Sequence, residues 1–249
     1  MSAEFITDII YKGGVPEDSW IASVPAIRYI MNKGRLPVDT GITILVGENG
    51  TGKSTLLEAV AVAAGFNPEG GTRNFSFSTN DTHSELYRAL RISRKRVPQD
   101  GYFLRAETFY NSATYIDNIY EQERRMGLNT PYGSSSLHDQ SHGESFMTLI
   151  SKRFGGGGLY ILDEPESALS PMRQMELLVI IKELEKQGAQ FIIATHSPIL
   201  MSCPGAKVLL LSGEGIEETD YKNTEHFRLT KTFLQDPERM LRYLFEEEN

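Results

Sequence analysis

One glycine-rich loop constrains this chain more than any other segment. It has the form G-x-x-x-x-G-K-S and follows residues 42–46, an apolar run long enough for one buried strand. The loop consists of Gly47, Glu48, Asn49, Gly50, Thr51, Gly52, Lys53 and Ser54. Its glycines let backbone N–H groups approach a triphosphate, Lys53 supplies a compact cation, and the Ser54 hydroxyl can ligate Mg²⁺. Together with Thr55, the loop predicts a site for ATP or GTP.

A plain glycine-rich turn between a strand and a helix is the alternative reading of this loop. A helix is expected directly after the loop, because apolar residues recur at helical spacing up to Gly65. The strand and the helix therefore both lie where a phosphate-binding loop requires them, and the plain turn is disfavoured.

The bulk composition indicates a globular chain of one compact unit over residues 1–249. Of its 249 residues 40% are hydrophobic, and no apolar stretch approaches the roughly 18 residues that a membrane span needs. The start of the chain lacks the pattern of a secretory signal, so a cytoplasmic protein is predicted. One cysteine, Cys203, excludes an internal disulfide and is expected to be buried.

The net charge of -8 argues against a generally basic face for nucleic acid. A local basic run at residues 91–96 is interpreted as the solvated flank of a helix. Nucleic-acid binding through this run is the alternative that remains open.

The order of predicted elements is typical of an α/β fold with a mostly parallel sheet. An N-terminal strand over residues 4–12 ends at a glycine-rich turn, and a strand over 101–104 precedes a possible helix over 107–125. After a helix over 144–154, strands and helices alternate, as parallel strands with crossover helices require. The strands are expected at residues 159–162, 190–194 and 207–211, and the helices at 171–187 and 197–202. A strand over 215–219 is predicted to form a hairpin with its predecessor, and Pro237 is predicted to begin a new helix within 230–245.

Polar residues follow two of these apolar strands. Asp163 and Glu164 end the strand that begins at residue 159, and His196 follows the strand over 190–194. Asp163 can hold Mg²⁺, whereas Glu164 can orient and deprotonate an attacking water. His196 can donate a hydrogen bond to a terminal phosphate oxygen. The alternatives are an acid pair that caps the next helix and a structural histidine.

These residues together resemble the ATP-binding cassette superfamily of ATPases. The resemblance covers the loop 47–54, Ser141-His142-Gly143-Glu144, Asp163-Glu164-Pro165, Ser167-Ala168-Leu169 and His196, in order and in approximate spacing. Val-Gly-Glu-Asn-Gly-Thr-Gly-Lys-Ser-Thr-Leu-Leu-Glu-Ala and Arg105-Ala106-Glu107 are similar to small stand-alone bacterial ATPases of the AAA_21-like group.

The resemblance implies a P-loop NTPase fold with an N-terminal antiparallel β portion and a helical subdomain inserted at about residues 108–155. It implies ATP rather than GTP, Mg²⁺ as cofactor, and Lys53, Glu164 and His196 as catalytic residues. Ser141 and the backbone of Gly143 would contact the ATP bound to the other subunit of a head-to-tail homodimer.

Five positions depart from the family pattern or lack a clear counterpart. Gln140 and His142 replace the usual leucine and first glycine of the signature, and Ser170 replaces an aspartate. Glu107 is the candidate for the metal-contacting glutamine, with Gln99 as the other. Tyr11, Trp20 and Tyr29 are the candidates for the adenine-stacking aromatic residue, and a place in the core is the alternative for each of them.

The resemblance implies an ATPase in which ATP closes the dimer and hydrolysis reopens it, so that a protein partner can use the change of shape. A slow nucleotide-gated signalling module is the first alternative. An ATPase subunit of a transporter and a component of DNA repair or phage defence are the others.

Overall fold

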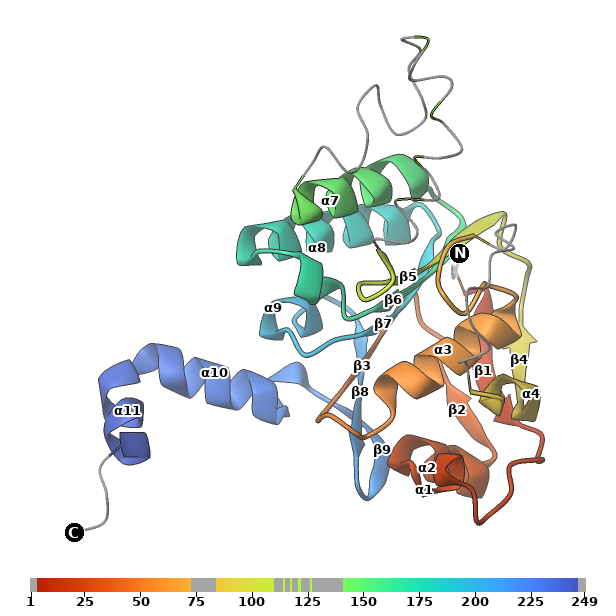
Figure 1. Cartoon of the computed structure of the whole chain (residues 1–249), viewed down its shortest axis with the longest axis horizontal. Coiled ribbons are helices and arrows are strands. Elements are labelled where there is room, and N and C mark those ends of the chain that lie inside the picture. The colour runs from red at the N-terminus through yellow and green to blue at the C-terminus, as the bar shows by residue number, and fades with distance from the viewer. Residues whose placement is uncertain are drawn as a thin grey trace.

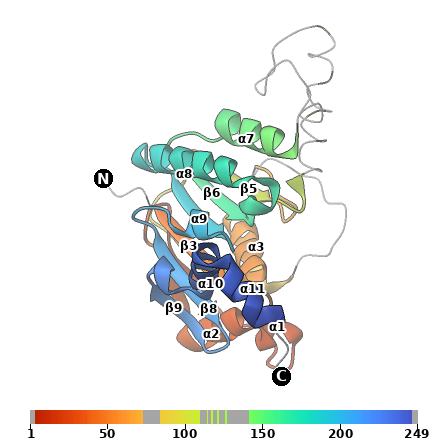
Figure 2. The ribbon, with the colours of Figure 1, turned by 90° about the vertical axis from the view of Figure 1, so that its left-hand side faces the viewer.

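The computed structural model describes residues 4–72, 84–109 and 141–245, and between the last two ranges also Thr114, Asp117, Glu121 and Met126. Within these residues a six-stranded sheet lies between two layers, one of helices and one of helices with a smaller sheet (Figure 1). Turning the molecule by 90° shows α7 and α8 on the side of the large sheet away from α2 (Figure 2).

The large sheet has the order β5-β6-β7-β3-β8-β9, in which only the β8–β9 pair is antiparallel. Its strands are β3 (Ile42–Gly47), β5 (Asp100–Arg105), β6 (Gly158–Asp163), β7 (Gln190–Ala194), β8 (Lys207–Ser212) and β9 (Gly215–Thr219). The small antiparallel sheet has the order β2-β1-β4, with β1 (Ile6–Tyr11), β2 (Arg35–Pro37) and β4 (Leu90–Arg94). This architecture is the α/β fold with a parallel core and an N-terminal antiparallel portion that the sequence predicts.

Helices cover both faces of the large sheet. The α-helices are α1 (Trp20–Ser23), α2 (Pro25–Lys33), α3 (Lys53–Ala64), α4 (Leu86–Ala89), α7 (His142–Arg153), α8 (Pro171–Lys186), α9 (Pro198–Met201), α10 (Glu225–Gln235) and α11 (Pro237–Phe245). Two short 3₁₀ helices, η2 (Pro165–Ala168) and η3 (Tyr221–Asn223), complete the described elements.

Alternation along the buried strands divides the core into two clusters. On β6, Tyr160 and Leu162 belong to the cluster with α7, α8 and α9, whereas Leu159 and Ile161 belong to the cluster with α2 and α3. Because successive strand residues point to opposite faces, one apolar strand serves both layers. The helix α3, which follows the phosphate-binding loop, thus lies on one side of the sheet, and α7 lies on the other.

Gln190 joins the two sheets. This side chain on β7 is fully buried, and its Oε1 accepts from the backbone N–H groups of Phe5 and Ile6, both at 2.8 Å. Its Nε2 donates to the carbonyl oxygens of Ile6, Val38 and Thr40, at 2.8 to 3.1 Å. One amide therefore satisfies backbone groups that neither sheet pairs at this junction.

The basic run at residues 91–96 follows the short helix α4, but it is a strand rather than the solvated helix flank that was predicted. Most of it forms the edge strand β4, which pairs with β1 and buries Leu90. Arg94 donates to the carbonyl of Ala64 at 3.0 Å, Lys95 lies 3.5 Å from Glu4, and the Arg96 guanidinium lies 4.4 Å from the Phe5 ring centroid. The run forms a strand because its alternating apolar residues match the pairing with β1. Its cationic side chains form contacts within the chain.

Several element predictions are confirmed and others lie outside the described residues. The β8–β9 hairpin and the start of a helix at Pro237 are as predicted, although α10 already begins at Glu225. Helices α1 and α2 were not predicted. The helix predicted at 107–125 and the inserted subdomain predicted at 108–155 fall largely outside the described residues, and α7 is the main described element in the second range.

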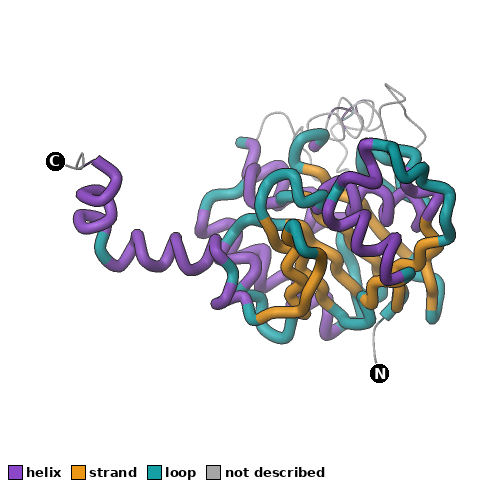
Figure 3. The backbone as a smooth tube through the Cα atoms, turned by 90° about the horizontal axis from the view of Figure 1, so that it is seen from below, coloured by secondary structure: helices purple, strands orange, loops and turns teal. Residues whose placement is uncertain are grey.

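The C-terminal helices α10 and α11 extend away from the rest of the molecule (Figure 3). Neither helix has a buried residue, whereas Thr224, the N-cap of α10, is fully buried. None of the helices in the described part of the chain has the length and hydropathy of a membrane span.

Candidate nucleotide-binding site

The predicted phosphate-binding loop connects β3 to α3, as the motif requires. Gly52 is the N-cap of α3 with φ +95°, and a Cβ there would lie 2.2 Å from a methyl carbon of Val24. A Cβ at Gly47, which has φ +154°, would lie 2.3 Å from the carbonyl oxygen of Leu211. The loop thus needs glycine at both positions to pass between its neighbours and present N–H groups at the helix start.

Lys53 is buried, and its ammonium group turns back onto the loop. Its Nζ donates to the carbonyl oxygens of Gly47 at 2.8 Å and Glu48 at 3.0 Å. Burial lowers the pKa of Lys53, while Glu164, Asp163 and Glu166 act in the opposite direction. This cation is therefore held at the inner side of the loop, where it can reach phosphate oxygens.

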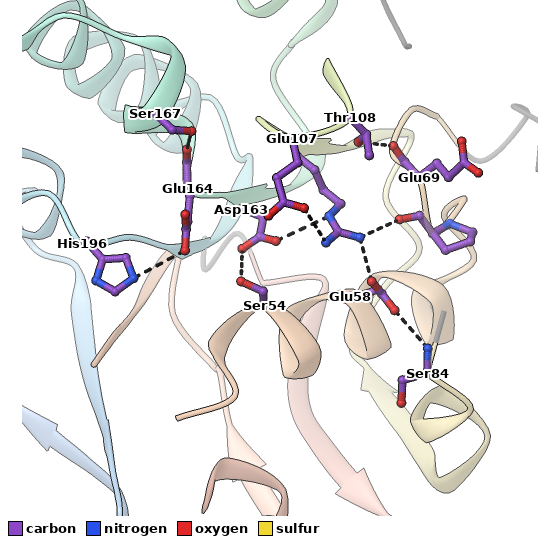
Figure 4. Close-up of polar contacts among 12 residues, drawn as sticks. Ser54, Glu58, Glu69, Ser84, Glu107, Thr108, Asp163, Glu164, Ser167 and His196 are labelled. Carbon is purple, nitrogen blue, oxygen red and sulfur yellow. Dashed lines mark hydrogen bonds and ion pairs between the residues drawn. The ribbon is translucent and has the colours of Figure 1, made fainter. Parts of the chain in front are cut away.

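Ser54 and Asp163 meet at the carboxyl ends of the strands, although 109 positions separate them in the chain (Figure 4). The Ser54 hydroxyl donates to Asp163 Oδ1 at 3.0 Å, and Nε of Arg105 lies 3.6 Å from Asp163 Oδ2. Arg105 also forms an ion pair with Glu58 on α3, at 2.7 Å. The hydroxyl and carboxylate are the hard oxygen donors that Mg²⁺ prefers.

Asp163 is the strongly perturbed acid of this site. Burial raises its pKa to about 6, and the positive charge of Arg105 and the Ser54 hydrogen bond offset only part of that effect. A divalent cation at this position would favour the ionised carboxylate. Ser54 and Asp163 fit Mg²⁺ as partial ligands that leave positions for phosphate and water, and the described residues contain no cluster of three or more metal-binding side chains.

Glu164 follows β6 with an unusual backbone. Its φ of 48° and ψ of 51° are left-handed. Among the described residues, every other residue with positive φ is a glycine. Its N–H donates to the Ala194 carbonyl at 3.0 Å, and its carbonyl accepts from the Ser167 hydroxyl at 2.8 Å. These bonds hold the carboxylate at the end of the sheet, where Oε1 lies 3.4 Å from Nε2 of His196.

His196 lies at the same edge because it follows β7, the neighbour of β6. Its backbone N–H donates to Glu166 Oε1 at 2.6 Å, and its Nδ1 lies 2.9 Å from Nε2 of His226 on α10. Burial, with Lys53 as the next cause, lowers the pKa of His196, which favours the neutral ring.

Ser141 is the N-cap of α7 and forms a capping box. The Ser141 N–H and hydroxyl both donate to Glu144 Oε2, at 3.0 and 2.7 Å. Gly143 packs closely, since a Cβ there would lie 3.2 Å from the Ala168 carbonyl oxygen. The helix α7, which carries Gly143 and has Ser141 as its N-cap, covers the opposite face of the sheet from α3, the helix that follows the loop (Figure 1).

The three aromatic candidates differ in their surroundings. Tyr11 accepts the Val15 N–H through its hydroxyl, and Tyr29 packs against Gly215. Trp20 is 63% exposed and lines a cavity of about 650 Å³ whose other lining residues include Ser54 and Thr55. Trp20 is therefore the aromatic residue that shares a cavity with the phosphate-binding loop.

Glu107 lies near this site with its carboxylate directed toward Arg105 (Figure 4). Its side chain is 80% exposed, and its Oε2 lies 3.6 Å from Nη2 of Arg105. Gln99, the other candidate, follows β4 and precedes β5.

Sequence reasoning missed three polar residues that the structure adds to this site. Arg105 contacts Asp163 and Glu58, Glu166 accepts from the His196 N–H, and His226 contacts the His196 ring. Arg105 and Glu166 directly adjoin recognised segments, so a systematic check of polar residues at strand ends would have found them. No motif marks His226, because it lies in α10, 30 positions after His196, and only the fold brings the two rings together.

Two family models match separate parts of this chain. A family model described as "AAA domain" matches residues 26–131, and another described as "AAA domain, putative AbiEii toxin, Type IV TA system" matches residues 135–202. The first range contains the phosphate-binding loop, and the second contains Asp163, Glu164 and His196.

Curated relatives are similar at low identity. An "Uncharacterized ABC transporter ATP-binding protein" of Haemophilus influenzae is 25% identical over 221 residues, 82% of each chain. The macrolide export ATP-binding/permease protein MacB 2 of Aeromonas hydrophila is 28% identical over 75% of this chain, and the match spans only 31% of that protein. Among solved structures, cbiO1 from Clostridium perfringens aligns with a TM-score of 0.48 at 16% identity, over 97% of this chain and 99% of that chain.

The sheet order, the loop between β3 and α3, and the acids at the end of β6 define a P-loop nucleoside triphosphatase fold. The family models and the curated relatives support an ABC-type ATPase superfamily for this chain. Members of this superfamily in general use a nucleotide with Mg²⁺.

Proposed function

We propose that this chain binds ATP with Mg²⁺ and hydrolyses it. The observation that carries the proposal is the meeting of Lys53, Ser54, Asp163, Glu164 and His196 at the carboxyl ends of adjacent parallel strands. Ligands of open α/β sheets bind at this edge. If Asp163 and Glu164 only capped a helix, the fold would not need a lysine and a histidine at the same edge of the sheet.

Each residue has a distinct role in this proposal. The loop N–H groups and Lys53 bind the phosphates, and Ser54 and Asp163 hold Mg²⁺, which neutralises charge on the phosphates when bound. Glu164 orients the attacking water and takes its proton, and His196 donates from Nε2 to a terminal phosphate oxygen. Positioning and electrostatics thus supply most of the catalysis.

The location of α7 supports a site completed by a second copy of the chain. Ser141 and the Gly143 N–H lie at a helix N-terminus, which favours anions, yet their helix α7 is on the opposite face of the sheet from α3, the helix that follows the loop. A head-to-tail homodimer would bring them to the terminal phosphate bound by the other copy. Two such composite sites are related by two-fold symmetry.

Trp20 is the proposed adenine-stacking residue. Its exposed indole lines the cavity that Ser54 and Thr55 also line, whereas Tyr11 and Tyr29 take part in packing. Glu107 keeps its proposed contact with Mg²⁺ through water, which requires its exposed side chain to turn inward from Arg105.

Substitution of the loop lysine tests nucleotide binding directly. Lys53→Ala should weaken ATP affinity more than about tenfold by calorimetry, because it removes the buried cation that faces the phosphates. Lys33→Ala, at the exposed end of α2, is the matched control and should bind as the parent does. Equal affinity of Lys53→Ala and the parent would overturn the proposed phosphate site.

A transporter ATPase subunit is the second candidate for the wider role. The Haemophilus influenzae relative, named as an ABC transporter ATP-binding protein and matched over 82% of its length, favours it. Co-purification of a membrane protein subunit with the tagged chain would support this role. A slow signalling module remains the alternative if turnover stays low with every partner.

A further inference from the structure

A second histidine contacts the ring of His196 from a distant part of the chain. His226 lies in the first turn of α10, and its Nε2 lies 2.9 Å from Nδ1 of His196. The two ring centroids are 4.9 Å apart with an interplanar angle of 57°, so the contact is edge-directed rather than stacked. This distance is that of a hydrogen bond between ring nitrogens, one of which must carry the proton.

The first turn of α10 is well anchored, although the rest of the helix is exposed. Thr224 is fully buried, donates to the Tyr221 carbonyl at 2.6 Å and accepts from the Phe227 N–H at 3.4 Å. Phe227 packs edge-on against Tyr221, with ring centroids 5.1 Å apart at 88°, and adjoins the core cluster of α7 to α9. His226, between these anchors, therefore has a defined position relative to His196.

The surroundings of the other ring nitrogen decide which tautomer His196 adopts. Nε2 of His196 is buried, has no hydrogen-bond partner among the described residues, and lies 3.4 Å from the Glu164 carboxylate. A lone pair on Nε2 would face this carboxylate and the negative phosphate proposed beyond it, which is unfavourable. A proton on Nε2 is favoured, and Nδ1 must then accept the hydrogen bond from His226.

We propose that His226 is a positioning residue for the ATPase site. Its Nε2–H donates to Nδ1 of His196, which keeps the proton of His196 on Nε2, directed toward Glu164 and the terminal phosphate. The inference rests on the proposed function, since it assigns His226 the task of orienting a residue of that site. A histidine that holds a neighbouring imidazole in one tautomer acts as the outer partners of catalytic and metal-bound histidines do.

Kinetic variants give the first test. His226→Ala and His226→Phe should lower kcat for ATP about tenfold, the loss expected for one orienting hydrogen bond, and should leave KM nearly unchanged. His226→Gln should recover much of the rate, because its amide can donate to Nδ1. Lys231→Ala, exposed on the same helix, is the matched control and should behave as the parent.

Nitrogen-15 NMR of the parent chain gives a second test that needs no turnover. The His196 ring, assigned by its loss in His196→Gln, should show a proton on Nε2 and none on Nδ1, and His226→Phe should shift this population. A proton on Nδ1 in the parent, or an unchanged kcat in both His226→Ala and His226→Phe, would overturn the assignment. A parent chain with no ATPase activity but with the Nε2–H tautomer would instead count against the proposed function alone.

Discussion

Glu164 combines an unfavourable backbone with the position proposed for the catalytic base. A left-handed conformation costs a residue with a Cβ about 1 kcal/mol, and here hydrogen bonds to Ala194 and Ser167 maintain it. The turn directs the carboxylate away from Asp163 and toward His196. The two adjacent acids are thereby separated into a buried partner of Ser54 and a more exposed group at the sheet edge.

Glu164→Gln should abolish turnover while leaving ATP binding intact. The amide keeps the shape of the side chain but cannot take a proton from water, so kcat should fall about a hundredfold or more. Phosphate release measures the rate, and calorimetry measures the affinity. Glu217→Gln, an exposed glutamate on β9, is the control, and hydrolysis by Glu164→Gln at the parental rate would show that another group is the base.

Trp20 offers a direct optical probe because it is the only tryptophan of the chain. ATP should change its fluorescence, since a stacked purine would replace water against the indole. Trp20→Ala should raise the Kd for ATP about tenfold, the change expected when one base loses its aromatic stacking partner. Trp20→Phe should raise the Kd less, because phenylalanine keeps an aromatic ring. An unchanged emission at saturating ATP would mean that adenine binds elsewhere.

At the residue scale, the sequence predicted the groups that lie in or next to a recognisable motif. The loop 47–54, Asp163, Glu164 and His196 were found because each follows an apolar run that ends at the same edge of a parallel sheet. Gln190 and His226 could not be found in this way. Their partners are more than 25 positions away, and hydrogen bonds between distant segments leave no periodic signal in one sequence.

At the scale of elements, the Gln190 side chain connects the two sheets through five hydrogen bonds. Gln190→Leu should destabilise the fold by more than about 2 kcal/mol, because several buried backbone groups would lose their partner. Urea unfolding measures this loss. Gln187→Ala, exposed at the end of α8, should change stability by less than about 0.5 kcal/mol, and equal effects of the two variants would refute the role of Gln190.

Element predictions succeeded where one pattern dominated. Buried strands such as β3 and β7 read as short apolar runs between turns, and α3 and α8 have helical periodicity with clear ends. The basic run was misread because its charges conceal the alternation of Leu90 and Ile92, and only pairing with β1 identifies β4. The β-propensity of a segment predicts a strand less reliably than an identified partner strand does.

At the scale of the whole molecule, the two halves of the proposed site lie on opposite faces of one sheet. The loop precedes α3 on one face, and Ser141 begins α7 on the other. The basic run at residues 91–96 does not favour a nucleic-acid role, because Arg94, Lys95 and Arg96 have partners within the chain. Symmetric pairing of two chains is the arrangement that would bring a loop and a Ser141 together.

The molar mass of Glu164→Gln in solution tests this account most directly. Light scattering with saturating ATP and Mg²⁺ should give twice the mass of one chain, and without nucleotide it should give a lower mass. Ser141→Arg in the same background should weaken the dimer, because a bulky cation would replace the hydroxyl at the start of α7 while the loop stays intact. A single-chain mass with ATP at every protein concentration would contradict the account.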